Sequence, residues 1–301
     1  MKNLILIALL TVSSFAYDLK PVKISNSVYQ FVGEVAVPSK ENGGNMVNTY
    51  WINTGKSYIV IDTGPSYNYA KAAHNAMKKI ADLPIKVIIN THMHDDHWSG
   101  NNYLKEQGGK IYATKAQAKK FPAGTSTHMM TVISKEDRAG TKVIGIDEYV
   151  TKNATITIDG TTLKFLYLGY IAHTKEDFMV YFPKEKVIFA GDLLFSQRIT
   201  SIRDGSVEGG LRSLRDIRKL DVKVYAAGHG IYTDHTPVIQ MQEYFMALKT
   251  RAMAAVEEDI GMSEFVKTAD FSDFKDRKMM EVLHKPNLGF AYGEYEFFEE
   301  E

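Results

Sequence analysis

Hydrophobic and polar positions follow two different periods along this chain. Short alternating runs separated by turn residues predict an antiparallel meander, with strands at 28–32, 46–52 and 58–61. Residues 67–83 instead carry apolar side chains at helical spacing and end before Pro84, which predicts a helix packed on the sheet. A β-branched run at 85–90 follows and predicts a buried strand.

The alternation of strands and helices continues to the C-terminus. Further strands are expected at 111–113, 156–158, 163–168, 177–182, 186–190 and 222–225, and helices at 101–107, 115–121, 211–220, 236–260 and 274–283. Such an order is typical of an α/β sandwich. Residues 121–154 show no sustained periodicity, so we expect an insertion that lies near a binding cleft.

Potential metal ligands are concentrated directly after the strand at 85–90. The ten residues 91–100 hold three of the nine histidines and two aspartates. In an extended backbone His92 and His94 point to the same side and can share one cation, whereas Asp96 and His97 can face a second. Imidazole and carboxylate ligands without a thiolate favour zinc, with iron or manganese as alternatives.

The segment His92-x-His94-x-Asp96-His97 resembles the defining motif of the metallo-β-lactamase-fold hydrolases. Later elements are similar to that family's other motifs, in the same order: Ala172-His173-Thr174, Gly191-Asp192 and Gly228-His229-Gly230. The resemblance runs from about residue 28 to about residue 235. It implies an αββα sandwich, in which two mixed β-sheets are flanked by helices.

The resemblance also implies a ligand set for two zinc ions per chain. The first ion would be held by His92, His94 and His173, the second by Asp96, His97 and His229, with Asp192 bridging them. Asp62, in an Asp-x-Gly segment similar to the family's, would orient a ligand histidine from behind, or would simply belong to a turn.

The implied activity is that of an enzyme, a binuclear hydrolase. A hydroxide generated by the metal ions would attack an ester, lactone, thioester or amide carbonyl, and Asp96 would accept or relay the proton. An aspartate at position 192 disfavours the cysteine-type class B β-lactamases. It is similar to the glyoxalase II, lactonase and sulfur-oxidation-associated (SoxH-like or quinoprotein-relay-like) branches.

Three alternatives stay open at this point: β-lactamase activity proper, an iron-dependent sulfur dioxygenase, and a non-catalytic metal-binding protein. A dioxygenase would bind one iron through fewer ligands, and a decayed site would lack some. The complete set of candidate ligands argues against both.

Composition limits the classes of molecule that this protein is expected to bind. The chain has 301 residues, 45% of them hydrophobic, which is enough for one sizeable core. It carries 36 Lys+Arg against 36 Asp+Glu, and this neutral balance argues against a nucleic-acid partner, so we expect a small-molecule substrate. It contains no cysteine, which fits export without disulfides.

The N-terminal residues 1–16 combine a short basic start, an apolar run and a small-residue exit, which predicts a secretory signal peptide cleaved after Ala16. The apolar run is too short for a spanning helix, although an uncleaved N-terminal anchor is the alternative. The mature protein is then expected to be periplasmic or secreted. Residues 17–301 would form a single domain with a C-terminal extension at 262–301.

Several other polar residues are weaker candidates. Arg198 or Arg203 could bind an anionic group of the substrate, although exposed arginines without such a role are more common. Tyr232 and His235 follow His229 closely enough to line the same cleft, and His128 is either a substrate contact or a surface residue. No role is assigned to His74, and His284 is expected to be structural.

Overall fold

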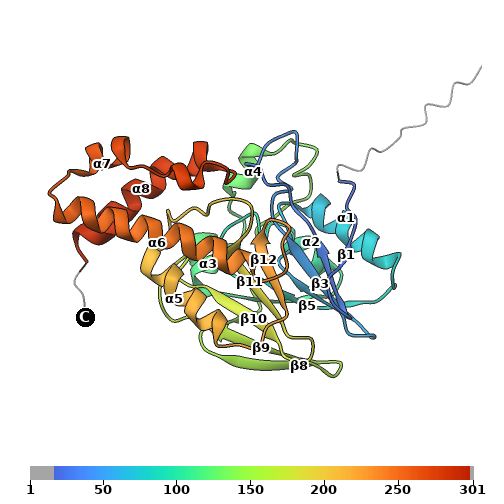
Figure 1. Ribbon diagram of the computed structural model, residues 1–301. Coiled ribbons are helices and arrows are strands. Elements are labelled where there is room, and N and C mark those ends of the chain that lie inside the picture. The colour runs from blue at the N-terminus through green and yellow to red at the C-terminus, as the bar shows by residue number, and fades with distance from the viewer. Residues whose placement is uncertain (1–16, 299–301) are drawn as a thin grey trace, which may run out of the picture.

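Two β-sheets lie face to face between helices in the computed structural model, which describes residues 17–298 (Figure 1). One sheet has seven strands in the order β1 to β7, and the other has five in the order β12-β11-β10-β9-β8. Apolar side chains from both sheets, including Tyr50 and Ile59 from one and Phe165 and Phe189 from the other, form the core between them. The expected signal peptide at 1–16 lies outside the described residues.

The seven-stranded sheet begins as an antiparallel meander and continues with parallel strands. Its strands are β1 (Val22–Lys23), β2 (Val28–Phe31), β3 (Thr49–Asn53), β4 (Tyr58–Ile61), β5 (Ile85–Ile89), β6 (Lys110–Ala113) and β7 (Glu148–Tyr149). Helices α1 (Tyr67–Lys78) and α2 (Asn101–Glu106) pack on its outer face. The Ser66 hydroxyl accepts the Tyr69 backbone N–H and so caps α1.

The five-stranded sheet comprises β8 (Ala154–Ile158), β9 (Thr161–Tyr167), β10 (Phe178–Phe182), β11 (Val187–Phe195) and β12 (Val224–His229). Its first four strands pair antiparallel, and β12 joins β11 in parallel. Helices α5 (Val207–Arg218), α6 (Thr236–Glu257) and α8 (Met280–Glu296) form the apolar layer on its outer side (Figure 1). The sandwich has the four layers that the sequence predicts.

Shorter helices complete the chain: α3 (Lys115–Lys120), α4 (His128–Val132), α7 (Met262–Thr268) and the 3-10 turn η1 (Ser272–Phe274). Helix α4 is the regular part of the 121–154 segment, which otherwise consists of turns and loops apart from β7. Within residues 17–298 no helix combines the length and apolar character needed to cross a membrane.

Helix α5 starts four residues earlier than the predicted start at 211. Two consecutive glycines suggested a loop, but both lie inside the helix. They occupy positions where close neighbours leave no room for a side chain. A Cβ on Gly209 would come within 1.7 Å of the Ile171 carbonyl oxygen, and one on Gly210 within 2.5 Å of the Phe245 ring. These glycines therefore allow α5 to pack closely.

The prediction of a helix at 274–283 is wrong in its bounds. The last helix begins at Met280, after Met279 in the left-handed region with φ 70°, and it continues through Pro286 to Glu296. Pro286, Gly289 and Gly293 lie inside this helix, although proline and glycine disfavour helices. Burial of Leu288, Ala291, Tyr292 and Tyr295 against α6 and α7 outweighs those local preferences.

Candidate metal centre

Seven candidate ligands converge at one edge of the sandwich from four separate chain segments. These segments are the loop after β5, the loop before β10, strand β11 and strand β12. Rigid strands thus aim the ligands, as a metal site requires. The ligands are His92, His94, Asp96 and His97 from the first loop, His173 from the second, Asp192 from β11 and His229 from β12.

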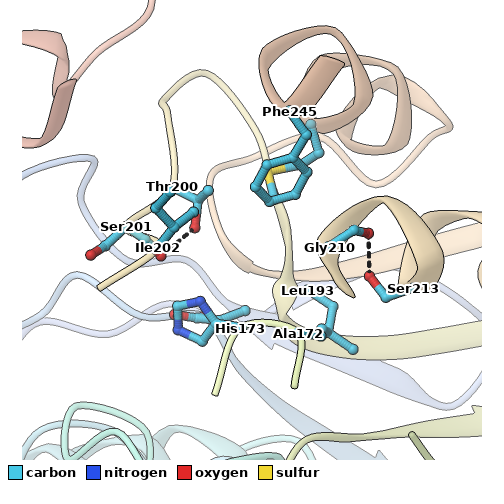
Figure 2. A pocket seen from close by; sticks show the side chains of 11 residues that line it. Ala172, His173, Leu193, Thr200, Ser201, Ile202, Gly210, Ser213 and Phe245 are labelled. Atoms are coloured by element: carbon cyan, nitrogen blue, oxygen red, sulfur yellow. Dashed lines mark hydrogen bonds and ion pairs between the residues drawn. The ribbon is translucent and has the colours of Figure 1, made fainter. Parts of the chain in front are cut away.

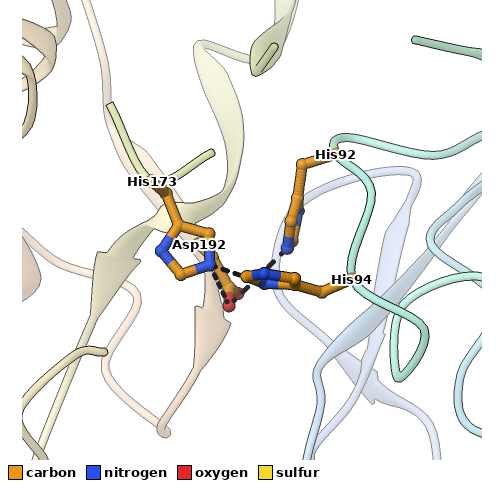
Figure 3. A group of neighbouring side chains, drawn as sticks. All are labelled: His92, His94, His173 and Asp192. Carbon is orange, nitrogen blue, oxygen red and sulfur yellow. Dashed lines mark hydrogen bonds and ion pairs between the residues drawn. The ribbon is translucent and has the colours of Figure 1, made fainter. Parts of the chain in front are cut away.

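The first ligand group consists of His92, His94, His173 and Asp192, whose side chains point toward one another (Figure 3). His94 Nδ1 lies 2.9 Å from His173 Nε2, which is 3.2 Å from Asp192 Oδ2. His92 Nε2 is 3.8 Å from the same carboxylate oxygen. One potential ligand atom from each residue therefore surrounds a common point, all within 4.8 Å of one another.

The second ligand group consists of Asp96, His97 and His229. Asp96 Oδ2 lies 3.6 Å from His97 Nε2 and 3.5 Å from His229 Nε2. Asp192 reaches this group through its other oxygen, because Oδ1 is 3.0 Å from His97 Nε2 and 3.3 Å from His229 Nε2. Asp192 thus presents one carboxylate oxygen to each group, which is the arrangement expected of a bridging ligand.

The buried polar atoms of this centre are short of partners. His92 Nε2, His97 Nε2 and Asp192 Oδ1 are buried and form no hydrogen bond with the described residues. Leaving such atoms unpaired costs about 1–3 kcal/mol each, so native proteins rarely do so without another partner. A cation coordinated by these atoms would satisfy all three, and the residues present fit a metal site.

Asp62 supports ligands of both groups from behind, directly for His97 and through Thr91 for His92, which is the first of the two roles considered for it. His97 Nδ1 donates to Asp62 Oδ2 at 2.8 Å, and the Thr91 hydroxyl donates to the same oxygen at 3.0 Å. The Thr91 hydroxyl also lies 3.0 Å from His92 Nδ1. A carboxylate partner fixes the tautomer, so that Nε2 of His97 is left free for a metal.

The remaining ligand rings and loops have partners of their own. His229 Nδ1 donates to the Met46 carbonyl oxygen at 2.6 Å, and His94 Nε2 donates to Asp204 Oδ2 at 3.0 Å. Asp177 is buried and accepts the backbone N–H groups of His173 and Thr174, so it fixes the His173 loop. Sequence reasoning missed Asp204 and Asp177; only Asp177, four residues after His173, offered a local signal.

The charges of this centre suit a bound cation. Burial lowers the pKa of His92 and His94, which keeps both imidazoles neutral. Burial alone would raise the pKa of Asp192, but the neighbouring His97, His229 and His173 hold it well below its ordinary value. Burial also opposes a charge on His97, yet Asp192, Asp96 and Asp62 raise its pKa well above the ordinary value. The surroundings of His97 therefore carry excess negative charge, which a cation would neutralise.

A cleft opens over both ligand groups. Its walls include Met46, Met129, Phe195, Arg198 and Met279. The 121–154 segment contributes Met129, whose N–H donates to Asp95 Oδ2 at 2.6 Å, and the exposed His128.

The weaker candidates divide around this cleft. Arg198 is only 6% exposed, so it does not match the alternative of an exposed arginine without a role. Arg203 is exposed and lines the rim, where it pairs with Asp204. Tyr232 and His235 are both exposed and do not belong to the residues that line the cleft.

The two remaining histidines contact aromatic residues away from the cleft. His74 is buried and stacks on Trp51, with its Nδ1 3.1 Å from the Tyr103 hydroxyl. His284 packs on Phe271 and lies 3.2 Å from the Tyr244 hydroxyl, which fits a structural residue.

A second, much smaller pocket is also lined by His173 and Asp192. Leu193, Ile202 and Phe245 give it a largely apolar wall (Figure 2). The hydroxyl of Thr200 donates to the Ser201 carbonyl oxygen at 3.2 Å and is thus paired. Apolar packing therefore supports the ligands from behind.

The family profile of the metallo-β-lactamase superfamily matches residues 42–229, which include all seven candidate ligands. This chain belongs to the metallo-β-lactamase superfamily. The resemblance inferred from the motifs is thereby confirmed, and the two mixed sheets flanked by helices are the fold of this superfamily. The superfamily consists mostly of hydrolases, so a metal-binding hydrolase is the general class to which the chain is assigned.

Individual relatives of this metallo-β-lactamase superfamily member are distant. It is 26% identical over 223 residues to a "Beta-lactamase-like protein 2 homolog" of Caenorhabditis elegans, covering 74% of this chain and 67% of the relative. It is 27% identical over 243 residues to a hydroxyacylglutathione hydrolase of Hyphomonas neptunium, covering 79% and 81%.

A solved structure, the sec-alkylsulfatase Pisa1 from Pseudomonas sp., superposes with a TM-score of 0.70 at 15% identity. The match covers 93% of this chain but only 51% of the sulfatase. At this level of sequence identity the similarity shows a shared fold alone.

Proposed function

We propose that this protein is a binuclear zinc hydrolase of small molecules that acts on an ester, lactone, thioester or amide carbonyl. The observation that carries the proposal is the position of Asp192, whose two oxygens face two complete ligand groups. His92, His94 and His173 would hold one ion, and Asp96, His97 and His229 the other. Zinc suits these nitrogen and oxygen ligands, with iron or manganese as alternatives.

Two bound cations would supply an acidified water, whose pKa zinc lowers to about 7, and would polarise the carbonyl under attack. The residues of the chain then have separate tasks. Asp96 lines the cleft and its Oδ2 lies beside His97 and His229, so its carboxylate is placed to accept or relay a proton. Apolar side chains in the cleft wall would lower the local dielectric around the reacting group, which would strengthen electrostatic stabilisation.

Two features bear on the alternatives. The second ligand group is assembled as completely as the first, which argues against a single-iron dioxygenase and against a decayed, non-catalytic site. The relative named hydroxyacylglutathione hydrolase supports an ester or thioester substrate. β-Lactam hydrolysis stays an alternative activity of the same centre.

The test is elemental analysis of the purified protein together with hydrolysis assays on lactones, thioesters, simple esters and nitrocefin, each with and without chelator. About two zinc ions per chain and chelator-sensitive hydrolysis are expected. About one iron per chain with oxygen consumption on persulfides would assign the protein to the dioxygenases. A protein that binds no metal tightly would refute the proposal.

We also propose that the mature protein begins at Tyr17 and is periplasmic or secreted. The order of basic, apolar and small residues in 1–16 supports this, because it is typical of a secretory signal. The Tyr17 hydroxyl donates to the Gly43 carbonyl oxygen at 2.6 Å, so the residue at the expected new terminus is packed against the domain. Mass spectrometry of the protein from separated cell fractions tests both points; an intact Met1 in the cytoplasmic fraction would contradict them.

A further inference from the structure

Arg198 is a buried cation beside the metal centre without an acidic partner. It follows β11, is 6% exposed, and forms part of the cleft wall together with Asp192 and His229. Its Nε donates to the Ile199 carbonyl oxygen at 3.2 Å, whereas its Nη1 is buried and has no hydrogen-bond partner. Within residues 17–298, Arg198 forms no ion pair.

A buried guanidinium is expensive unless an anion pairs with it. The Phe195 ring, 5.3 Å from the guanidinium carbon, offers one partial compensation through its π face. The acidic groups that act on its charge at longer range, Asp192 and Asp96, are candidate metal ligands. Cations bound to those carboxylates would neutralise them, so the loaded site leaves the charge of Arg198 uncompensated.

The C-terminal extension holds Arg198 in this position. Ile199 N donates to the Lys278 carbonyl oxygen at 3.1 Å, and Lys278 N donates to the Gln197 carbonyl oxygen at 3.0 Å. The backbone on both sides of Arg198 is thus paired with a segment outside the range 42–229 of the superfamily match. Directly after Lys278, the side chains of Met279 and Leu283 enter the wall of the same cleft.

These walls are chemically divided. Arg198 supplies a positive charge close to the ligands, while Met46, Met129, Met279 and Leu283 supply apolar surface. Methionine side chains are flexible and adapt to apolar groups of varied shape. The cleft is therefore suited to a molecule that carries both kinds of group.

We propose that Arg198 binds an oxyanion group of the substrate while Met279 and Leu283 of the C-terminal extension contact its apolar part. The substrate class is then an anionic amphiphilic ester or a related acyl compound. The inference rests on the proposed hydrolase function, and it adds the C-terminal extension to the substrate site.

Binding is measured first, because it does not depend on turnover. Zinc-loaded protein is titrated calorimetrically with pentanoate, pentane-1-sulfonate and neutral pentan-1-ol. Arg198→Gln is expected to weaken binding of the anions by about tenfold or more, equal to about 1.4 kcal/mol. Arg198→Lys should weaken it less, because it keeps the charge but loses the planar fork. If Arg198→Gln weakens binding of only one anion, the site prefers either the planar carboxylate of pentanoate or the tetrahedral sulfonate of pentane-1-sulfonate. Both results support an oxyanion site.

Arg203→Gln is the matched control, because Arg203 lines the same cleft but is exposed and paired with Asp204. It should weaken anion binding by less than about threefold, as expected for a screened surface charge. Equal losses in both variants would mean that only general positive charge attracts anions, which overturns the role of Arg198. Unchanged binding in a folded Arg198→Gln protein overturns it as well; melting curves and Arg198→Lys guard against misfolding.

Turnover then tests the substrate class with two matched esters, mono-para-nitrophenyl glutarate and para-nitrophenyl pentanoate. The wild-type protein should prefer the anionic ester in kcat/KM, and Arg198→Gln should reduce the ratio by about tenfold, mainly through KM. If neither ester is hydrolysed, the proposed ester chemistry is at fault, and the binding data still decide the anion site.

Leu283→Ala and Met279→Ala test the apolar wall. Each should lower the gain in kcat/KM that a longer acyl chain gives by about fourfold, equal to the roughly 0.8 kcal/mol gained per buried methylene. Val282→Ala is the control, because Val282 lies on the same helix but is 51% exposed and outside the cleft lining. An unchanged chain-length profile in both wall variants would remove the C-terminal extension from the substrate site.

Discussion

The two ligand groups differ in what holds them from behind. In the second group, His97 is fully buried and its outer nitrogen bonds to Asp62, which is 2% exposed. In the first group, the His94 side chain is 16% exposed and its outer nitrogen bonds to Asp204, whose side chain is 25% exposed. One group is thus supported from the core, the other partly from the surface.

The difference follows from the elements that supply the supports. Asp62 directly follows β4, a central strand that is paired with β3 on one side and β5 on the other. Asp204 lies in the loop before α5, where Lys120 and Arg203 compete for its carboxylate at 3.7 and 3.3 Å. A buried hydrogen bond in low dielectric is stronger than a screened one, so we expect the second group to keep its geometry more rigidly.

Asp192 joins the two groups, so its replacement should have the largest effect. Asp192→Ala removes an oxygen from each group, and we expect metal content to fall from about two ions to one or none, with kcat/KM lower by on the order of 1,000-fold. Elemental analysis and ester hydrolysis measure the two effects, and melting curves check the fold. A variant that retains both ions would show that the two groups are independent.

Asp62→Asn should have the next largest effect. Asp62 has φ 55°, in the left-handed region that asparagine also tolerates, so the variant changes charge with little backbone strain. Loss of the carboxylate behind His97 should weaken one metal site by about 10- to 100-fold. Competition with a zinc chelator measures this as loss of one ion at a lower chelator concentration. Simultaneous loss of both ions would mean that Asp62 supports both groups equally, the first of them through Thr91.

Asp204→Asn should weaken metal binding by less, about tenfold at most, because water can replace a partly exposed carboxylate. The same chelator competition measures it. Asp216→Asn is the matched control, since its carboxylate is similarly exposed and hydrogen-bonded, to Tyr170, away from the centre. A loss as large as that of Asp62→Asn would contradict the distinction between core and surface support.

The same contrast explains what the sequence could predict. His92, His94, Asp96 and His97 follow one strand within six residues, so their proximity is a local property of the chain. Their joining with His173, Asp192 and His229 was expected only from the family motifs. Asp204 contacts His94 across 110 positions and lies in a loop without periodicity, so no local pattern could reveal it.

Tertiary packing accounts for the errors in the fold. Pro286, Gly289 and Gly293 disfavour a helix, yet burial against α6 and α7 keeps α8 helical through them. The burial of Arg198 has the same origin, because it depends on backbone pairing with Lys278, eighty residues away. Such pairings are set by the folded whole and leave no periodic trace.

His74 is a buried histidine that lies outside both ligand groups, so it shows what burial alone does to an imidazole in this fold. Burial, aided by Lys78, lowers its pKa to about 4, against about 6.5 when unfolded. Between these values the unfolded chain binds more protons, so the free energy of unfolding must fall as pH decreases from 6.5 toward 4.

In His74→Gln that contribution disappears. The loss of unfolding free energy between pH 7 and pH 4.5 should be smaller than in wild type by about 2 kcal/mol, measured by urea unfolding of zinc-free protein at both pH values. The ligand histidines titrate in both proteins and cancel in the difference. An identical pH dependence would mean that His74 takes up its proton in the folded state as readily as in water, so that burial alone does not keep a histidine neutral in this fold. The neutral state of His92 and His94 would then have to come from within the metal centre itself.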